Sequence, residues 1–169
     1  MSDEITARPA VTEDDLKHLR RCVELAEEAL DAGDQPFGSV LVDGDGAVLF
    51  EDRNRETSLA DETRHPEFQA ARWAAAQLPQ ERRAAATVYT SGEHCAMCAA
   101  AHAWVGLGRI VYASSTEQLV GWSAELSLAP SPVRPLAIQE VAPNIPVSGP
   151  VPDLAEAVHA LHRRRLSGN

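Results

Sequence analysis

The segment SGEHCAMC, residues 91–98, decides how the rest of the chain is interpreted, because it contains two cysteines three positions apart. If Cys95 and Cys98 open a helix, their side chains lie on one face of it. A neutral histidine from another segment, such as HPE at residues 65–67, completes a set of three ligands suited to zinc. Three protein ligands leave a fourth position open for water, so this pattern indicates a catalytic site more than a structural one.

Glu67 lies two residues after His65 and offers a proton acceptor beside the expected metal. The order and spacing of His65-x-Glu67 and Cys95-x-x-Cys98 resemble those of the cytidine deaminase-like superfamily of zinc deaminases. The resemblance implies one Zn²⁺ per chain, held by His65, Cys95 and Cys98, with Glu67 as the catalytic proton carrier. His94 stands where the family usually has proline, and we do not assign it as a ligand because a neighbour of Cys95 would strain to reach the same ion.

The resemblance also implies substrate-binding residues. Asn54, eleven residues before His65, matches an asparagine that binds the base in purine and tRNA deaminases of the superfamily. Phe37 is similar to an aromatic residue that lines the base pocket of guanine deaminase-like members. Trp122 and Glu125 follow the fourth expected strand, where guanine-directed members bring an acidic group to the substrate amine. A turn asparagine, a core phenylalanine and a solvated glutamate remain the alternatives for these positions.

Two other interpretations of the cysteine pair stay open. A structural zinc site would need a fourth ligand, which Cys22, His94 or His102 could supply, but such sites usually combine two cysteine pairs and this chain has one. A thiol-disulfide motif also places Cys-x-x-Cys at a helix start after a strand. It would not require the separate His-x-Glu segment at residues 65–67.

Hydrophobic periodicity and turn residues predict an α/β order along the chain, with a strand-helix-strand crossover that favours parallel pairing. The resemblance makes this a three-layer α/β/α domain with a central mixed five-stranded sheet, as in the cytidine deaminase-like fold. The expected helices are residues 12–33, 66–78, 96–105 and 152–166; the expected strands are 39–42, 47–50, 86–90, 109–113 and 145–147; residues 51–64 are expected to be a loop and residues 120–150 an extended proline-rich segment.

The composition indicates a single globular domain over residues 1–169. Hydrophobic residues make up 44% of the chain, and no apolar run approaches the roughly 20 residues that cross a bilayer. Met1 to Pro9 show neither a secretory signal nor a transit peptide. Three cysteines give no disulfide framework and fit a reducing compartment, with Cys22 as a plain buried thiol. We therefore expect a cytoplasmic protein without a membrane partner.

The net charge of -10 argues against a nucleic-acid substrate, because such binders usually present a basic face to phosphates. The run Arg163 to Arg165 is more typical of a solvated helix end. We expect hydrolytic deamination of a small amino-substituted nucleobase or related heteroaromatic, of the guanine, isoguanine, cytosine-analogue or amino-triazine type, which releases ammonia. The alternatives are a tRNA adenosine deaminase and an inactive deaminase-fold binding module. A homodimer is expected from the resemblance alone.

Overall fold

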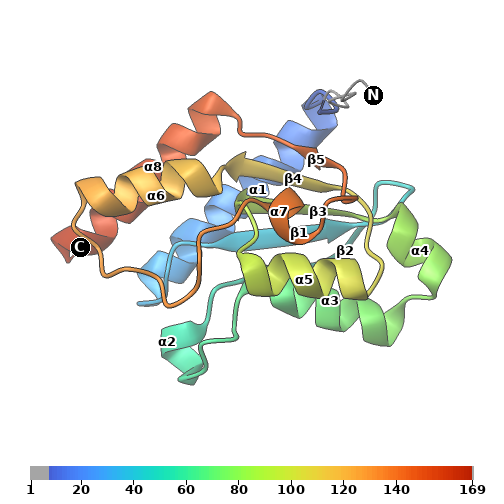
Figure 1. The fold of residues 1–169 in the computed structure, drawn as a ribbon, viewed down its shortest axis with the longest axis horizontal. Coiled ribbons are helices and arrows are strands. Elements are labelled where there is room, and N and C mark those ends of the chain that lie inside the picture. Colours follow the sequence, from blue (N-terminus) through green and yellow to red (C-terminus); the bar gives the residue numbers. More distant parts are fainter. Residues whose placement is uncertain (1–7, 169) are drawn as a thin grey trace.

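The computed structural model describes residues 8–168 and has a mixed five-stranded sheet at its centre (Figure 1). The strands lie in the order β2-β1-β3-β4-β5. β1 is antiparallel to both of its neighbours, whereas β3, β4 and β5 are parallel. The predicted hairpin, the parallel crossover and the mixed sheet are therefore confirmed. The strands are β1 (Gly38–Val42), β2 (Val48–Arg53), β3 (Thr87–Gly92), β4 (Ile110–Ser114) and β5 (Val147–Ser148).

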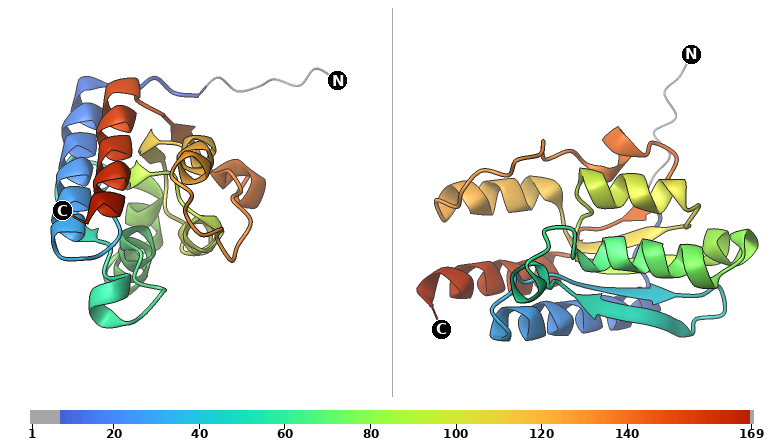
Figure 2. Two further views of the ribbon diagram at one scale, coloured as in Figure 1. Left: turned by 90° about the vertical axis from the view of Figure 1, so that its left-hand side faces the viewer. Right: turned by 90° about the horizontal axis from the view of Figure 1, so that it is seen from below.

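Helices cover both faces of this sheet, which gives the expected three layers (Figure 2). One pair of long helices, α1 and α8, packs on one face, and α3 and α5 pack on the other. The long helices are α1 (Glu13–Asp31), α3 (Pro66–Gln77), α5 (Ala96–Trp104), α6 (Thr116–Glu125) and α8 (Pro152–Ser167). The short ones are α2 (Glu56–Leu59), α4 (Gln80–Ala85) and α7 (Ile138–Val141).

The first helix begins as its sequence predicts. The hydroxyl of Thr12 accepts a hydrogen bond from the backbone of Asp15, and the carboxylate of Asp15 accepts one from the backbone of Thr12. Close approach to the sheet requires Gly38, because a side chain there would collide with the Leu25 side chain and the Cys22 carbonyl of α1. The cap and the glycine together fix how α1 crosses the first strand.

The inner strand β1 is buried on both faces, and its side chains point alternately into two separate parts of the core. Val40 and Val42 pack with Leu19 and Leu25 of α1. Leu41 belongs to the opposite cluster, which is built from alanines of α3 and from the strand β3. The buried residues of the second cluster are Leu41, Ala71, Ala74, Leu78, Ala86, Val88 and Leu107.

The prediction of an extended segment over residues 120–150 is wrong for part of its length. Helix α6 continues to Glu125 and is opened by a capping box between Ser115 and Gln118. A second short helix, α7, lies within the segment. The sequence did not indicate α6 because this helix buries none of its residues fully, so it carries little apolar periodicity. The loop expected over residues 51–64 likewise contains the end of β2 and the helix α2.

Within the part of the chain that the structure describes, no helix combines the length and the apolar character that a membrane crossing requires. We expected neither a secretory signal nor a transit peptide in Met1 to Pro9, and only the last two of these residues belong to the described part of the chain.

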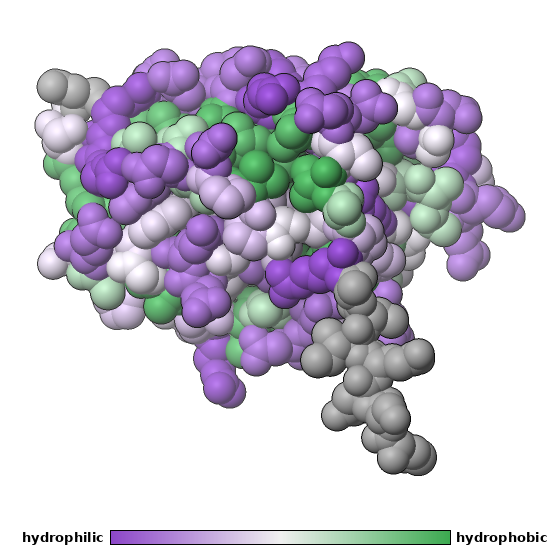
Figure 3. Space-filling model, turned by 90° about the horizontal axis from the view of Figure 1, so that it is seen from above, coloured by the Kyte–Doolittle hydropathy of each residue, from purple (hydrophilic) through white to green (hydrophobic). Residues whose placement is uncertain are grey.

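On the face seen from above, apolar residues group within a largely hydrophilic surface (Figure 3). Among the described residues, the exposed large apolar side chains are Val48, Leu59, Trp104, Val120, Val133 and Leu166.

An ion pair between the buried Asp15 and the partly buried Arg109 joins α1 to the residue before β4. Asp15 is 3% exposed. Each oxygen of its carboxylate accepts a hydrogen bond of 3.0 Å from the guanidinium group of Arg109. The Tyr89 hydroxyl donates to the same carboxylate at 2.8 Å. Burial acts to raise the pKa of Asp15, but the hydrogen bonds from the Thr12 backbone and from Arg109 outweigh it and lower the pKa below 3.8.

Replacing Asp15 by asparagine should destabilise the fold by about 1–3 kcal/mol, because the partly buried Arg109 and the Tyr89 hydroxyl then lose the carboxylate that accepts their hydrogen bonds. Since the folded-state pKa is lowered, the carboxylate stabilises the protein above pH 3.8 and loses this effect as the pH falls through the folded value. Urea unfolding at several pH values measures the difference. The exposed neighbour Asp14, changed to asparagine, is the matched control, and an equal effect of both changes would contradict the prediction.

Candidate active site

The two halves of the motif meet where two helices begin. His65 is the residue that precedes α3, with Pro66 at the first helical position as predicted. Cys95 is the residue that precedes α5, and Cys98 lies in the first turn of that helix. Strand β3 ends at Gly92, so it delivers the chain directly to the cysteines. The packing of α3 against α5 on one face of the sheet brings the three side chains together.

The three ligand atoms have the spacing of a metal site. The sulfurs of Cys95 and Cys98 lie 3.5 Å apart, and Nδ1 of His65 lies 3.6 and 3.5 Å from them. A tetrahedral zinc ion with sulfur at about 2.3 Å and nitrogen at about 2.0 Å has ligand-to-ligand edges of about 3.5–3.8 Å. The donor atoms and their separations therefore fit zinc. Among residues 8–168 this is the one cluster of three such donors.

The protonation of the cysteines also favours a cation. A hydrogen bond from Cys98, helped by His65, lowers the pKa of Cys95 to about 4. The neighbouring thiolate and burial raise the pKa of Cys98 above its ordinary value. Two adjacent thiolates repel each other unless positive charge lies between them. A divalent ion supplies that charge and lets both sulfurs act as ligands.

Glu67 lies beside the ligands and is almost completely buried, with 6% of its surface exposed. One carboxylate oxygen is 2.9 Å from the Thr90 hydroxyl, and the other is 3.8 Å from the Cys98 sulfur. Burial raises the pKa of Glu67 above 4.5. A carboxylate with a raised pKa, held next to a metal site, is suited to accept and return a proton.

Glu93 holds the loop that precedes the cysteines. Its two carboxylate oxygens accept hydrogen bonds from the backbone of Thr116 at 2.8 Å and of Ile138 at 2.9 Å. These contacts connect the loop to the first residues of α6 and α7. Glu93 therefore supports the loop that leads to Cys95.

Asn54 is buried, with 1% of its surface exposed, and lies directly after β2. Its backbone donates to the Phe37 carbonyl at 2.9 Å. Its side-chain amide donates to Glu56 at 2.6 Å and accepts from the Glu56 backbone at 3.0 Å. Glu56 in turn contacts His65, so Asn54 is linked to the metal ligands through one residue. Sequence reasoning missed Glu56, because only the fold of the loop reveals its contacts.

The other expected substrate residues lie in an aromatic group shared by α6, α8 and the loop before β1. The half-buried Phe37 ring lies against Gly92, because a Cβ added to this glycine would be 3.2 Å from the ring. The Phe37 ring also meets the His162 ring edge-on, with ring centres 5.4 Å apart. Trp122 stacks on His159 with ring centres 4.6 Å apart. Glu125 is more than half exposed and contacts His159 at 3.4 Å. The sequence signalled neither histidine of α8.

The remaining histidines near the motif do not join the ligands. His94 is completely buried and packs edge-on against His102, with ring centres 5.5 Å apart. Burial lowers the pKa of both imidazoles, so they stay neutral. Neither they nor the buried Cys22 belongs to the cluster of donors at His65. The alternative of a structural site with a fourth protein ligand thus lacks support in the described residues.

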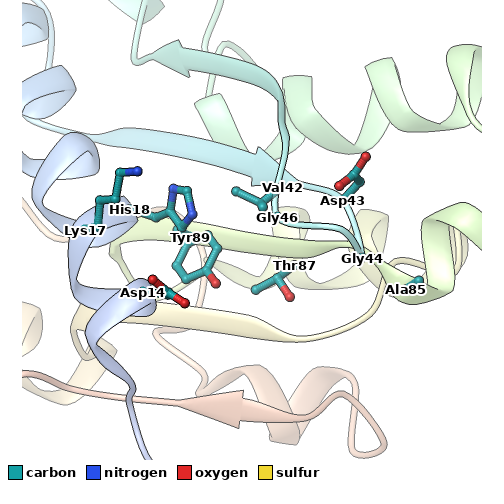
Figure 4. Close-up of a pocket in the computed structure, with 10 residues that line it drawn as sticks. All are labelled: Asp14, Lys17, His18, Val42, Asp43, Gly44, Gly46, Ala85, Thr87 and Tyr89. Carbon is teal, nitrogen blue, oxygen red and sulfur yellow. The ribbon is translucent and has the colours of Figure 1, made fainter.

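A shallow cavity of about 360 Å³ lies elsewhere, between α1, the turn after β1 and the start of β3 (Figure 4). Lys17 and His18 of α1, Asp43 of the turn and Tyr89 of β3 are among its lining residues. It shares no residue with the donor cluster. We therefore place the candidate active site at the cysteines and not in this cavity.

The fold and the site define a three-layer α/β/α protein with a His-Cys-Cys centre suited to zinc. Comparison with known proteins agrees: the family model of the cytidine and deoxycytidylate deaminase zinc-binding region matches residues 12–114. The chain belongs to this family. The matched region contains His65, Glu67, Cys95 and Cys98, and the predicted family and zinc as its cofactor are confirmed.

The relatives act on different substrates. The chain is 35% identical over 112 residues to a probable cytosine deaminase of Schizosaccharomyces pombe, covering 65% of this chain and 66% of the relative. It is 39% identical over 97 residues to the guanine deaminase of Bacillus subtilis, covering 57% and 62%. Further relatives include tRNA-specific adenosine deaminases. The matched part spans less than two thirds of the length of these relatives.

A solved structure extends the likeness over almost the whole fold. The guanine deaminase of Nitrosomonas europaea superposes with a TM-score of 0.70 over 95% of this chain and 87% of that chain, at 20% identity. At this identity the likeness concerns the fold. It includes the C-terminal part of the chain, which lies outside the matched family region.

Removing one ligand should remove the zinc. We expect one zinc per chain in the purified protein and less than a tenth of that in the Cys95→Ser and His65→Ala variants, because two remaining ligands hold the ion weakly. Elemental analysis of the dialysed protein measures the content. Cys22→Ala is the matched control, since this buried cysteine is outside the cluster and its loss should leave the zinc in place. Equal zinc in all four proteins would refute the assignment.

Proposed function

We propose that this protein hydrolytically deaminates a small amino-substituted nucleobase or related heteroaromatic and releases ammonia. The observation that carries the proposal is the buried carboxylate of Glu67 next to three zinc-type ligands. A site that only held a metal would not need a buried proton carrier beside it. The chemistry of the family points in the same direction.

The proposed roles follow from the contacts of each residue. His65, Cys95 and Cys98 hold the zinc, which when bound supplies the Lewis acidity that makes water a nucleophile near neutral pH. Glu67 accepts a proton from the attacking water and delivers it to a ring nitrogen of the substrate, and then assists the departing amine. Thr90 lies within hydrogen-bonding distance of Glu67 and orients its carboxylate for these transfers.

The substrate class is proposed from charge and from the relatives. The net charge of -10 disfavours a polyanionic substrate. The one arginine run is engaged within the protein, because Arg163 pairs with Glu156, Arg164 pairs with Asp31 and Arg165 contacts Gln35. A free base of the guanine or cytosine type is therefore favoured. The tRNA-specific relatives keep a tRNA adenosine deaminase as the second candidate.

Asn54, Phe37, Trp122 and Glu125 remain the proposed substrate-binding residues. Phe37 supports this because its ring lies against the end of the strand that leads to Cys95. We also propose a cytoplasmic homodimer without nucleic-acid or membrane partners. The free cysteines suit a reducing compartment, and the exposed apolar side chains offer area for a second subunit.

Ammonia release tests the activity. Zinc-loaded protein should release ammonia from one or a few compounds in a panel of free bases, nucleosides and amino-triazines, while Glu67→Gln should be slower by about 10²–10⁴-fold because it cannot accept a proton. A tRNA anticodon stem-loop belongs in the same panel. Turnover of the stem-loop alone would favour the second candidate. No turnover of any compound by the stoichiometrically loaded protein would favour the inactive binding module.

Trp122 can be tested once a substrate is known. Its replacement by alanine should lower kcat/KM by about 5–150-fold through a higher KM, because stacking on a base is worth about 1–3 kcal/mol. Steady-state kinetics measure this split. Trp73→Ala is the matched control, since that ring stacks on Phe50 and lies outside the aromatic group of Trp122. An unchanged KM in Trp122→Ala would show that this ring does not contact the substrate.

A further inference from the structure

Glu56 is a carboxylate close to the metal ligands to which neither the sequence nor the family comparison gives a role. It is the first residue of α2, and its side chain is 16% exposed. One of its oxygens faces a metal ligand and the other faces the proposed substrate ligand. These two contacts, and the way the loop is held, carry the inference.

The first contact is with His65. Oε1 of Glu56 lies 3.5 Å from Nε2 of His65, within ion-pair range and longer than an ordinary N–H···O hydrogen bond of about 2.7–3.2 Å. The opposite nitrogen of the ring, Nδ1, faces the sulfurs of Cys95 and Cys98. The imidazole is thus placed between a carboxylate and the two thiol ligands, with one nitrogen directed to each side.

The second contact is with Asn54. Oε2 of Glu56 accepts a hydrogen bond from the side-chain amide of Asn54 at 2.6 Å. The backbone of Glu56 donates to the amide oxygen of Asn54 at 3.0 Å, which closes a ring between the two residues. The orientation of this buried amide is therefore set by Glu56.

The loop that carries Glu56 is held on both sides of this residue. Asp34 accepts hydrogen bonds from the backbone of Ser58, at 2.8 Å, and from its hydroxyl. Before the loop, the backbone of Asn54 donates to the Phe37 carbonyl. Asp34 is itself buried and paired with Arg53. The position of Glu56 thus follows from buried contacts, and not from a freely moving side chain.

The chemistry of imidazole explains why this position matters. A neutral histidine carries its proton on one ring nitrogen and a lone pair on the other. Binding a metal through Nδ1 requires the proton on Nε2, and an acceptor at Nε2 selects this tautomer and fixes the ring plane. Oε1 of Glu56 is the carboxylate oxygen that faces Nε2 of His65.

We propose that Glu56 is a positioning residue that orients His65 for metal binding through Nε2 and fixes the amide of Asn54 with its second oxygen. The metal ligand His65 and the proposed substrate ligand Asn54 are then both oriented by Glu56. This inference rests on the proposed function, because it concerns the zinc centre of the same site.

A purely local role predicts something different. An acidic residue in the first turn of a helix interacts favourably with the helix dipole, and Glu56 also closes the turn with Asn54. Such a role would change the stability of the loop. It would leave the zinc affinity and the tautomer of His65 unchanged, so these two quantities separate the explanations.

Chelator competition measures the zinc affinity of the wild type, Glu56→Ala and Glu56→Gln. We expect a loss of about 10–100-fold in Glu56→Ala, as for other partners of metal-bound histidines. Glu56→Gln should lose less, because its one carbonyl oxygen can still accept a hydrogen bond from either His65 or Asn54. Glu62→Gln is the matched control, an exposed carboxylate of the same segment, and should bind zinc as tightly as the wild type.

Long-range ¹H–¹⁵N NMR of the zinc-loaded proteins gives the tautomer of His65 independently of turnover. We expect a protected Nε2 proton in the wild type and faster exchange of this proton in Glu56→Ala. Thermal unfolding of the metal-free proteins identifies a variant that fails to fold. If Glu56→Ala fails to fold, the isosteric Glu56→Gln is used instead. Its zinc affinity and the exchange rate of the His65 Nε2 proton then decide between the two explanations.

The outcomes separate the two proposals. If the wild type binds no zinc, the proposed function fails and this inference fails with it. If the wild type binds zinc and the folded Glu56 variants bind it within twofold of the same affinity, the inference alone is overturned. Weaker zinc binding together with faster exchange at Nε2, and no change in Glu62→Gln, establishes the positioning role.

Discussion

The site depends on the meeting of two helix beginnings at one edge of the sheet. His65 and Cys95 each stand immediately before a helix, and neither helix end has a side-chain cap. The backbone N–H groups of such an end carry partial positive charge. This charge stabilises thiolates and reduces the electron density that they donate to a metal. The absence of caps at these two ends therefore suits the chemistry of the centre.

The approach of the two helices depends on small side chains. Alanines of α3 and α5 are buried where these helices face the sheet and each other, among them Ala70, Ala74 and Ala99. Larger residues would separate the helices and increase the distances between His65 and the cysteines. The composition of the core on this face and the ligand distances are thus set by the same constraint.

Much of this arrangement could be predicted from the sequence, because it is encoded locally. The cysteine spacing, the proline at the start of α3 and the capping box of α1 each act within a few residues. Helix α6 could not be predicted, since it has a capping box but no buried stripe. The contacts of Glu56 and the stacking of Trp122 on His159 join distant segments, and no local pattern encodes them.

The order of these parts along the chain has a consequence for engineering. The zinc ligands and Glu67 lie between residues 65 and 98, whereas the aromatic group of Trp122, His159 and His162 comes from α6 and α8, which follow that region. Randomised libraries restricted to the last third of the gene can therefore reshape the surroundings of Phe37 while the metal-binding segment stays constant.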